Sequence, residues 1–378
     1  MRIGVLGGGQ LGQMLAQAGT RLGHSFRFFD PDPEACARSE GEHVCAAYED
    51  ERALARFCDG LDLATFEFEN VPVACAEFVA QRVPMHPSPG SLRLTQDRVH
   101  EKEWFERCAF ETAPWRAVDS AASLVAAVAA VGVPGILKSR RGGYDGKGQA
   151  RVDNASGAMA AWESIGHVPA IYEKRIAFQR ELSLIVARSP VGELAWCPLV
   201  ENTHAGGILR TTRAPATGVD EAVERLARDH AQRLVEDLGH VGVFTIELFQ
   251  CEGGRLLANE TAPRVHNSGH WTIEGAPTSQ FENHLRAITG ERPGSMVPVT
   301  PSAMVNLIGR IPDAVRAVRE PGVFLHDYGK APRAGRKVGH ITIAGRSGPD
   351  TDALVARVLA LIAADGQNEA RYPSMMAP

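Results

Sequence analysis

The chain of 378 residues lacks a cysteine framework, a long hydrophobic run and an excess of basic residues. Its seven cysteines are scattered and never spaced as CxxC, which argues against disulfides or structural zinc and favours reduced thiols in the cytoplasm. No apolar run is long enough to span a bilayer, and MRIGVLGGG leads directly into a strand, so we expect neither membrane insertion nor a signal peptide. A net charge of -5 without a basic domain argues against nucleic-acid binding.

The first residues have the pattern of a doubly wound α/β domain. A strand is expected at 2–6, a glycine turn at 7–12, a helix at 11–22 and a second strand at 25–29. The turn fits GxGxxG, with Asp30 about 20 residues on, but such a loop serves any ligand that needs close approach to a helix N-terminus. A later strand at 61–69 carries Glu67 and Glu69 at its carboxyl end, where they either face a ligand or are solvated.

A hairpin is predicted from strands at 241–249 and 256–261 around Gly253-Gly254. If these glycines form a two-residue loop, Glu247 lies directly opposite Glu260 on the same face, with Cβ atoms roughly 5 Å apart. Like charges at that distance are destabilising, so a cation is expected between them, and Mg²⁺ holding phosphate oxygens fits two hard carboxylates. The alternative is a register shifted by one residue, which would turn one carboxylate to solvent.

Three loops carry polar or cationic groups in unusual density. The loop after the second hairpin strand is rich in donors and looks like an anion site; its polar residues include Asn259, Arg264, His266, Asn267, Ser268 and His270. Residues 140–149 hold four glycines and three cations without Walker spacing, so they form either a flap that wraps phosphates or a surface hairpin. Residues 328–337 hold four cations, which suit either a phosphate or carboxylate site or a solvated turn.

The remaining segments predict a mixed α and β protein with two further units. A charged helical connection is expected at 91–110, with Gln96, Arg98 and Lys102 among its residues and most of its charges facing solvent. A new unit begins near 112, with strands at 135–138, 171–175, 179–188, 193–200 and 207–213 and helices at 120–131, 219–238 and 278–290. A Pro/Gly-rich boundary at 290–301 precedes strands at 304–308, 323–326 and 338–344 and a helix at 351–364.

Taken together, these segments resemble the ATP-grasp superfamily and, within it, the family of 5-(carboxyamino)imidazole ribonucleotide synthetases. The motifs that carry the resemblance are GVLGGGQLG, FEFENVP, KSRRGGYDGKGQ, FQREL, PLVENTHAGGILR, NETAPRVHNSGHWTIE and LHDYGKAPRAGRKVGH. The resemblance implies an N-terminal Rossmann-like α/β domain that binds substrate (1–105), an ATP-grasp domain (106–295, with a flexible central lobe at about 113–190) and a small mixed β domain (296–378). It also implies a homodimer.

The implied reaction carboxylates 5-aminoimidazole ribonucleotide with bicarbonate. ATP and Mg²⁺ are the expected cofactors, carboxyphosphate is the expected intermediate, and 5-(carboxyamino)imidazole ribonucleotide, ADP and phosphate are the products, in de novo purine (IMP) biosynthesis. Other ATP-grasp ligases, such as a formate-dependent glycinamide ribonucleotide transformylase, are the nearest rivals. A Rossmann oxidoreductase would explain only the first thirty residues, and a non-catalytic nucleotide sensor would not need both metal carboxylates.

The resemblance also assigns residues to the site. ATP would be bound by Arg98, Lys138, Gly143, Tyr144, Asp145, Gly146, Lys147, Gly148, Gln149, Glu173, Lys174, Arg175, Ile176, Glu181, His204, Asn259 and Glu260, and the metal by Glu247 and Glu260. The ribonucleotide would be bound by Gln10, Leu11, Glu67, Tyr144, Asp145, Ser268, Lys330, Arg336 and Lys337. Catalysis and bicarbonate binding would fall to Asp145, Lys147, Arg264, His266 and Asn267, helped by Ser268, with Asp145 or His266 removing the proton from the amine.

Overall fold

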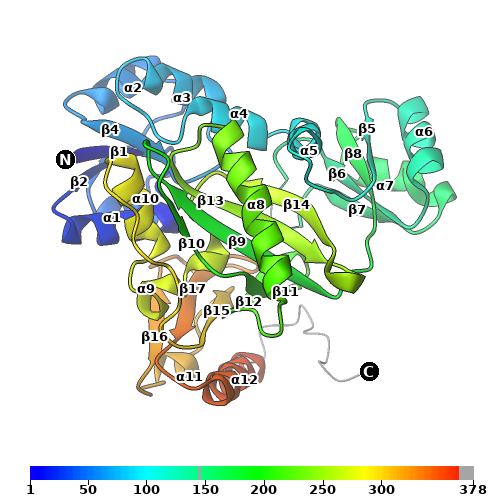
Figure 1. Cartoon of the computed structure of the whole chain (residues 1–378). Helices are drawn as coiled ribbons and strands as arrows, with labels where there is room; N and C mark the ends of the chain where they lie inside the picture. The colour runs from blue at the N-terminus through cyan, green and yellow to red at the C-terminus, as the bar shows by residue number, and fades with distance from the viewer. Residues whose placement is uncertain (144–145, 366–378) are drawn as a thin grey trace.

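The computed structural model describes residues 1–143 and 146–365, which form three sheets with helices around them (Figure 1). The N-terminal sheet is parallel, in the order β3-β2-β1-β4, and confirms the expected α/β opening. Its strands are β1 (Arg2–Leu6), β2 (Ser25–Phe29), β3 (Glu42–Val44) and β4 (Leu63–Phe66). Helix α1 (Gln10–Arg21) packs with one set of buried residues and helices α2 (Glu51–Cys58) and α3 (Val73–Ala80) with another, so the sheet is covered on both faces.

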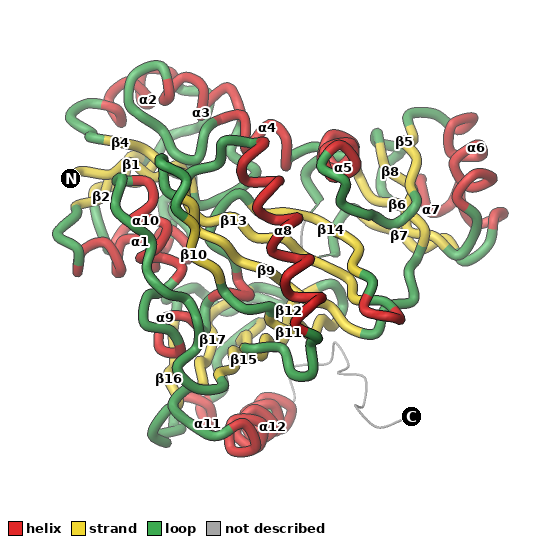
Figure 2. The backbone as a smooth tube through the Cα atoms, viewed as in Figure 1, coloured by secondary structure: helices red, strands yellow, loops and turns green. Residues whose placement is uncertain are grey.

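Two short helices lead from this domain to a small lobe. They are α4 (Pro89–Thr95) and α5 (Arg98–Arg107), and the lobe beyond them is a four-stranded sheet in the order β5-β8-β6-β7. Its elements are β5 (Trp115–Val118), α6 (Ala121–Val131), β6 (Gly135–Ser139), β7 (Gln149–Val152), α7 (Ala158–Ser164) and β8 (Ala170–Lys174). The lobe has its own buried core, formed where α6 and α7 pack on the sheet, and it projects to one side of the molecule (Figure 2).

The largest sheet follows the order β14-β13-β9-β11-β12-β15-β17-β16, with β10 paired to β9. Its strands are β9 (Arg180–Arg188), β10 (Leu194–Trp196), β11 (Val200–Ala205), β12 (Ile208–Ala214), β13 (Gly242–Gln250), β14 (Leu256–Ala262), β15 (Ser302–Ile308), β16 (Val323–Asp327) and β17 (Lys337–Ile343). The single strand expected at 193–200 is wrong, because β10 ends at Trp196 and a separate strand begins at Val200. Figure 2 shows α8 (Glu221–Asp237) lying across this sheet, where it covers a large apolar core.

The C-terminal strands continue the large sheet instead of forming a separate one. Strand β15 pairs antiparallel with β12, so the sheet crosses the boundary expected at 290–301. The remaining helices are α9 (Thr272–Gly275), α10 (Gln280–Ile288), α11 (Asp313–Arg316) and α12 (Gly348–Ala364), and α12 buries its apolar face against β15 and β17. The division at residue 296 stays a prediction. None of the helices in the described ranges is long and apolar enough to cross a membrane.

Candidate active site

The hairpin of β13 and β14 brings Glu247 opposite Glu260, as predicted. The expected two-residue loop is wrong: Cys251 N donates to Arg255 O at 2.8 Å, which leaves a loop of three residues, Glu252–Gly254. That loop shifts the register by one residue, so that Leu248 pairs with Ala258. A bulge then leaves Asn259 without a partner in the ladder and restores the pairing of the two glutamates. The predicted pairing of the two residues is confirmed, although it depends on two compensating irregularities.

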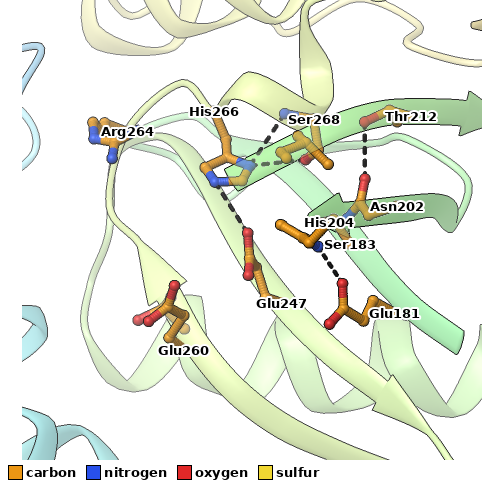
Figure 3. Close-up of polar contacts among 12 residues, drawn as sticks. Glu181, Ser183, Asn202, His204, Thr212, Glu247, Glu260, Arg264, His266 and Ser268 are labelled. Atoms are coloured by element: carbon orange, nitrogen blue, oxygen red, sulfur yellow. Dashed lines mark hydrogen bonds and ion pairs between the residues drawn. The ribbon is translucent and has the colours of Figure 1, made fainter. Parts of the chain in front are cut away.

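The two carboxylates have different electrostatic environments. Burial and the charge of Glu260 raise the pKa of Glu247 to about 7, and His266 Nε2 lies 3.2 Å from its Oε1 (Figure 3). Burial alone would also raise the pKa of Glu260, but Arg98 and Lys138 outweigh it and lower the value to about 2. Arg98 Nη1 donates to Glu260 Oε2 at 2.8 Å. The protein thus compensates the like charges only in part.

This donor set fits a magnesium ion that also binds phosphate oxygens. Mg²⁺ is typically held by one or two carboxylates plus substrate phosphates and water, and the hairpin offers two carboxylates on rigid strands. In the described part of the chain no larger group of His, Cys, Asp and Glu is placed for a metal. A divalent cation between Glu247 and Glu260 would remove the repulsion that raises the Glu247 pKa.

Strands β9 and β11 add Glu181 and His204 beside the hairpin. The Glu181 carboxylate contacts His204 Nδ1 (Figure 3). Burial lowers the pKa of His204, but the hydrogen bond with Glu181 and the charge of Glu247 more than reverse this, so its pKa is raised. Behind them, Asn202 Nδ2 donates to Ser183 Oγ at 2.6 Å and accepts at Oδ1 from Thr212 Oγ1 at 2.9 Å. This buried polar row fixes β9, β11 and β12 relative to one another, and the sequence interpretation did not include it.

The loop after β14 places the predicted bicarbonate residues at the end of the hairpin. His266 links the predicted metal ligand Glu247 to Ser268, with Nε2 facing Glu247 and Nδ1 lying 2.8 Å from Ser268 Oγ. Burial and the nearby Arg264 guanidinium lower the pKa of His266 to about 3, so its imidazole is neutral at pH 7. The amide oxygen and nitrogen of Asn267 are both buried without a hydrogen-bond partner among the described residues. An orphaned buried amide beside a neutral histidine suits a polar ligand.

Arg264 ties this loop to the N-terminal domain. Its guanidinium forms a close ion pair with Glu69, which follows β4. Burial raises the pKa of Glu69, but Arg264 outweighs that and the net pKa is lowered. The pairing of Glu69 with Arg264 was not predicted, because the two residues are 195 positions apart.

Part of the predicted ribonucleotide set lies around the glycine turn. Glu67 is 6% exposed and accepts hydrogen bonds from Gly9 N at 2.9 Å and Gly12 N at 3.3 Å. The alternative prediction, that the Glu67 side chain is solvated, is therefore wrong. Asp30 Oδ2 accepts from Gly8 N at 2.7 Å. Both acids therefore satisfy backbone N–H groups at the start of α1.

The basic loop 328–337 approaches the same turn. Lys330 Nζ contacts Gln10 Oε1, and burial lowers the Lys330 pKa. Lys337 lies close enough for its charge to lower the pKa values of His266 and Glu247. Arg336 donates to Ala331 O at 3.3 Å within the loop. Leu11 is 7% exposed and belongs to the apolar core, so packing accounts for its side chain.

The small lobe supplies the other side of the site. Lys138 Nζ donates to Glu173 Oε2 at 2.6 Å and to Asn259 Oδ1 at 3.4 Å, which brings three predicted nucleotide residues together. Arg98 Nη2 reaches Gly143 O at 3.3 Å, and Gly146 lies against the Gly206-Gly207 turn that joins β11 to β12. The segment from 140 to 149 thus contacts both α5 and the large sheet. Tyr144 and Asp145 lie outside the described residues.

Some predicted nucleotide side chains are directed elsewhere. Lys174 Nζ donates to Val133 O at 2.8 Å, and Arg175 pairs with Asp153 at 3.2 Å, so both ammonium and guanidinium groups bind within the small lobe. Of the other predicted nucleotide residues near these two, Lys147 and Gln149 are exposed, and Gly148 and Ile176 are half-buried. The role of these residues stays a prediction.

Helix α5 and its N-cap residue bury charged side chains in a segment whose charges were mostly expected in solvent. Asp97, Glu101 and Lys102 are the exceptions to that expectation, since they are 1%, 2% and 1% exposed. Glu101 Oε1 accepts from Thr261 N at 2.7 Å, next to Glu260. Positions 98, 101 and 102 have the i, i+3, i+4 spacing of one helix face. That spacing was the available signal for a charged face turned toward a site.

Comparisons with known proteins agree with this geometry. Residues 1–96 match the ribonucleotide synthetase preATP-grasp domain, residues 103–281 the ATP-grasp domain, and residues 302–353 the phosphoribosylaminoimidazole carboxylase C-terminal domain. The N5-carboxyaminoimidazole ribonucleotide synthase of Pseudomonas aeruginosa is 48% identical over 364 residues, which are 96% of this chain and 100% of that protein. The expected ATP-grasp fold is confirmed.

Two solved structures are similar over nearly the whole chain. The N5-carboxyaminoimidazole ribonucleotide synthetase of Thermus thermophilus has a TM-score of 0.90 and 49% identity, covering 96% of this chain and 98% of that one. The N5-carboxyaminoimidazole synthase of Aspergillus clavatus, in complex with ADP and 5-aminoimidazole ribonucleotide, has a TM-score of 0.89 and 31% identity, with coverage of 96% and 98%.

Proposed function

The chain belongs to the family of N5-carboxyaminoimidazole ribonucleotide synthases, and from this we propose that it joins bicarbonate to the amine of 5-aminoimidazole ribonucleotide with ATP and Mg²⁺. It is an ATP-dependent ligase of purine biosynthesis. The observation that carries the proposal is the pairing of Glu247 with Glu260 across the hairpin, between Lys138 on one side and His266 on the other. This arrangement supports a phosphate-activating centre at the hairpin with an anion-binding loop beside it.

The residues around the hairpin suit a nucleotide triphosphate. Lys138 and Arg98 bring positive charge to the side of the small lobe, and the glycines of residues 140–149 expose backbone N–H groups to phosphate oxygens. A magnesium ion bound by Glu247 and Glu260 would neutralise charge as the terminal phosphate is transferred. Glu181 and His204 lie on the same face and complete the nucleotide site.

The chemistry proceeds in two steps. An oxygen of bicarbonate attacks the γ-phosphorus, the bond to the β-phosphate oxygen breaks, and carboxyphosphate and ADP form. The ribonucleotide amine then bonds to the carboxyl carbon, the carbon–oxygen bond to phosphate breaks, and the amine loses a proton. Arg264 and the orphaned amide of Asn267 would hold the bicarbonate oxygens, and His266 is one proposed base for the amine proton. Asp145 is the alternative base.

The ribonucleotide would lie between the glycine turn and the basic loop. Lys330, Arg336 and Lys337 supply the charge for its phosphate, Gln10 fixes Lys330, and Ser268 lies near the reacting end. Exclusion of water protects carboxyphosphate, and closure of residues 140–149 over the site would serve that purpose. We also propose a homodimer that acts in the cytoplasm.

The test is ADP release by the purified protein in ATP, Mg²⁺ and bicarbonate, with and without 5-aminoimidazole ribonucleotide. Strong stimulation by the ribonucleotide that also requires bicarbonate is expected. Stimulation by glycinamide ribonucleotide and formate instead would retain the ATP-grasp chemistry and overturn the carboxylation. A Glu260→Gln variant should lose the stimulation, because one of the two metal carboxylates is removed.

A further inference from the structure

Lys102 of helix α5 is among the largest fully buried side chains of the described residues. Lysine is almost never fully buried unless it is paired. Its ammonium donates to Asn259 O at 2.9 Å and Ala258 O at 3.3 Å, and it lies 3.4 Å from Glu173 Oε1. One side chain from the connecting helix therefore reaches a strand of the small lobe, β8, and a strand of the large sheet, β14.

Lys138 contacts the same two partners through different atoms. It binds the other oxygen of Glu173, Oε2, at 2.6 Å, and the side-chain oxygen of Asn259 at 3.4 Å. The Lys138 side chain is 11% exposed, whereas that of Lys102 is 2% exposed. The two lysines thus share Glu173 and Asn259, and Lys138 is the one nearer to solvent.

Because the two lysines share one carboxylate, Lys102 affects how strongly Glu173 neutralises the charge of Lys138. Burial alone would raise the pKa of Glu173, but the charges of Lys102 and Lys138 outweigh it and lower the pKa to about 2. Glu173 is therefore an anion shared by two cations, so Lys138 is not fully engaged by Glu173 and its charge also acts on Glu260, whose pKa it lowers. If Lys102 were absent, Lys138 would be the sole lysine compensating a buried carboxylate.

Lys102 also supports the bulge that sets the metal register. Asn259 has no partner in the ladder between β13 and β14, so its carbonyl needs a donor from elsewhere, and Lys102 provides it. The next residue is Glu260. The position of this carboxylate relative to Glu247 therefore depends on how firmly the bulge is held.

We propose that Lys102 is a positioning residue of the nucleotide site, which neutralises Glu173 from behind and anchors the Asn259 bulge, so that Lys138 is left to bind nucleotide phosphate. The inference rests on the proposed function only in that this site takes a nucleotide. Lys102 itself does not reach the opening of the site, since its ammonium is enclosed by its three oxygen partners.

The test compares Lys102→Met, which keeps the length of the side chain, with two controls on the same helix. Val99→Ala opens a small apolar cavity, and Glu103→Gln changes an exposed charge. ADP binding with Mg²⁺ is measured by calorimetry, together with the KM values for ATP and for the ribonucleotide. Lys102→Met is expected to weaken ADP binding about tenfold or more and to raise the KM for ATP alone, whereas both controls bind ADP as the wild type does.

Unchanged ADP affinity in Lys102→Met, or an equal loss in Val99→Ala, would overturn the inference. If Lys102→Met folds poorly, a second measurement compares the stability of the double variant Lys102→Met/Glu173→Gln with that of the two single variants. The double variant removes both charges of the pair, so neither is left buried without the other. The double variant should be less destabilised than the sum of the two single changes, and strictly additive losses would contradict the proposal. Wild-type protein that binds ADP but ignores the ribonucleotide would refute the carboxylation and leave the Lys102 inference standing.

Discussion

Asp97 holds the first residues of the segment 140–149 and offers a sharp test of how that segment is anchored. Its carboxylate is 1% exposed and pairs with Arg140 Nε at 2.7 Å and Arg141 Nη2 at 3.0 Å. The same carboxylate caps α5 by accepting from Val99 N at 3.1 Å. The substitution Asp97→Asn removes the charge but retains a good capping side chain, so it separates the two roles.

The expected magnitude follows from the exposure of the two arginines. The Arg141 side chain is 62% exposed, and an exposed pair contributes only about 0.2–1 kcal/mol. The Arg140 side chain is 26% exposed, so its hydrogen bond to the carboxylate contributes about 1–2 kcal/mol, less than the roughly 1.5–3 kcal/mol usual for a charged partner. Asp97→Asn should therefore loosen the segment by roughly 1–3 kcal/mol, and Asp97→Ala should cost about 1 kcal/mol more through the lost cap.

Limited trypsin digestion measures this directly, because Arg140 and Arg141 are themselves cleavage sites. When opening is fast, cleavage follows the population of the open form, so Asp97→Asn should accelerate cleavage at these arginines about five- to a hundredfold. Cleavage after the exposed Arg319 is the internal control and should not change. Equal cleavage at Arg140 and Arg141 in wild type and variant would refute the reasoning.

The pH dependence has a defined sign. Burial raises the pKa of Asp97, but its hydrogen bonds with Arg140 and Arg141 outweigh it, and the net pKa is lowered. A carboxyl group whose pKa is lowered by folding stabilises the protein above its unfolded pKa, about 3.9, and loses that contribution as the pH falls through the folded value. The difference in stability between wild type and Asp97→Asn should therefore be complete at pH 7 and shrink below about pH 4.

Two further substitutions test the substrate side. Gln10→Ala should raise the KM for the ribonucleotide severalfold and leave the KM for ATP unchanged, because Gln10 contacts Lys330. Gln17→Ala on the exposed face of α1 is the matched control. Equal KM values for the ribonucleotide in the two variants would contradict the assignment of Gln10. Glu69→Gln should lower the free energy of unfolding by about 1.5–3 kcal/mol and reduce kcat, because it leaves the guanidinium of Arg264 without its carboxylate; unchanged denaturation and kcat would show that the pair does not position Arg264.

The hairpin shows what strand alternation can and cannot predict. Two acids on one face of neighbouring strands follow from a period of two and an approximate turn position, and this was enough to place Glu247 opposite Glu260. The loop length and the bulge at Asn259 were not predictable from the alternation of side chains. A loop one residue longer shifts the strand register by one, and a bulge further along shifts it back, so the same side chains still face each other beyond the bulge. The prediction counted residue pairs outward from a two-residue loop. That register is correct from the pair of Glu247 and Glu260 onward, away from the loop, and is wrong between the loop and the bulge.

Helix α5 shows the limit more clearly. Its sequence is rich in charged residues, which are ordinarily solvated. The i, i+3, i+4 spacing of positions 98, 101 and 102 marks one helix face, but it does not show which surface that face meets. The burial of Glu101 and Lys102 depends on where α5 lies between the small lobe and β14, which is a property of the tertiary fold. The pair of Arg264 with Glu69 likewise joins two domains. Motif resemblance predicted which residues contact the ligands, whereas the residues that hold those side chains in place could be identified only from the structure.

The most direct test of the central claim follows isotopically labelled bicarbonate through one reaction. The protein is mixed with ATP, Mg²⁺, 5-aminoimidazole ribonucleotide and bicarbonate that carries heavy carbon and heavy oxygen. We expect heavy carbon on the amine of the ribonucleotide product and one heavy oxygen in the released phosphate, because carboxyphosphate forms through a bicarbonate oxygen. Phosphate without heavy oxygen, or ADP release without labelled ribonucleotide, would contradict the proposed mechanism.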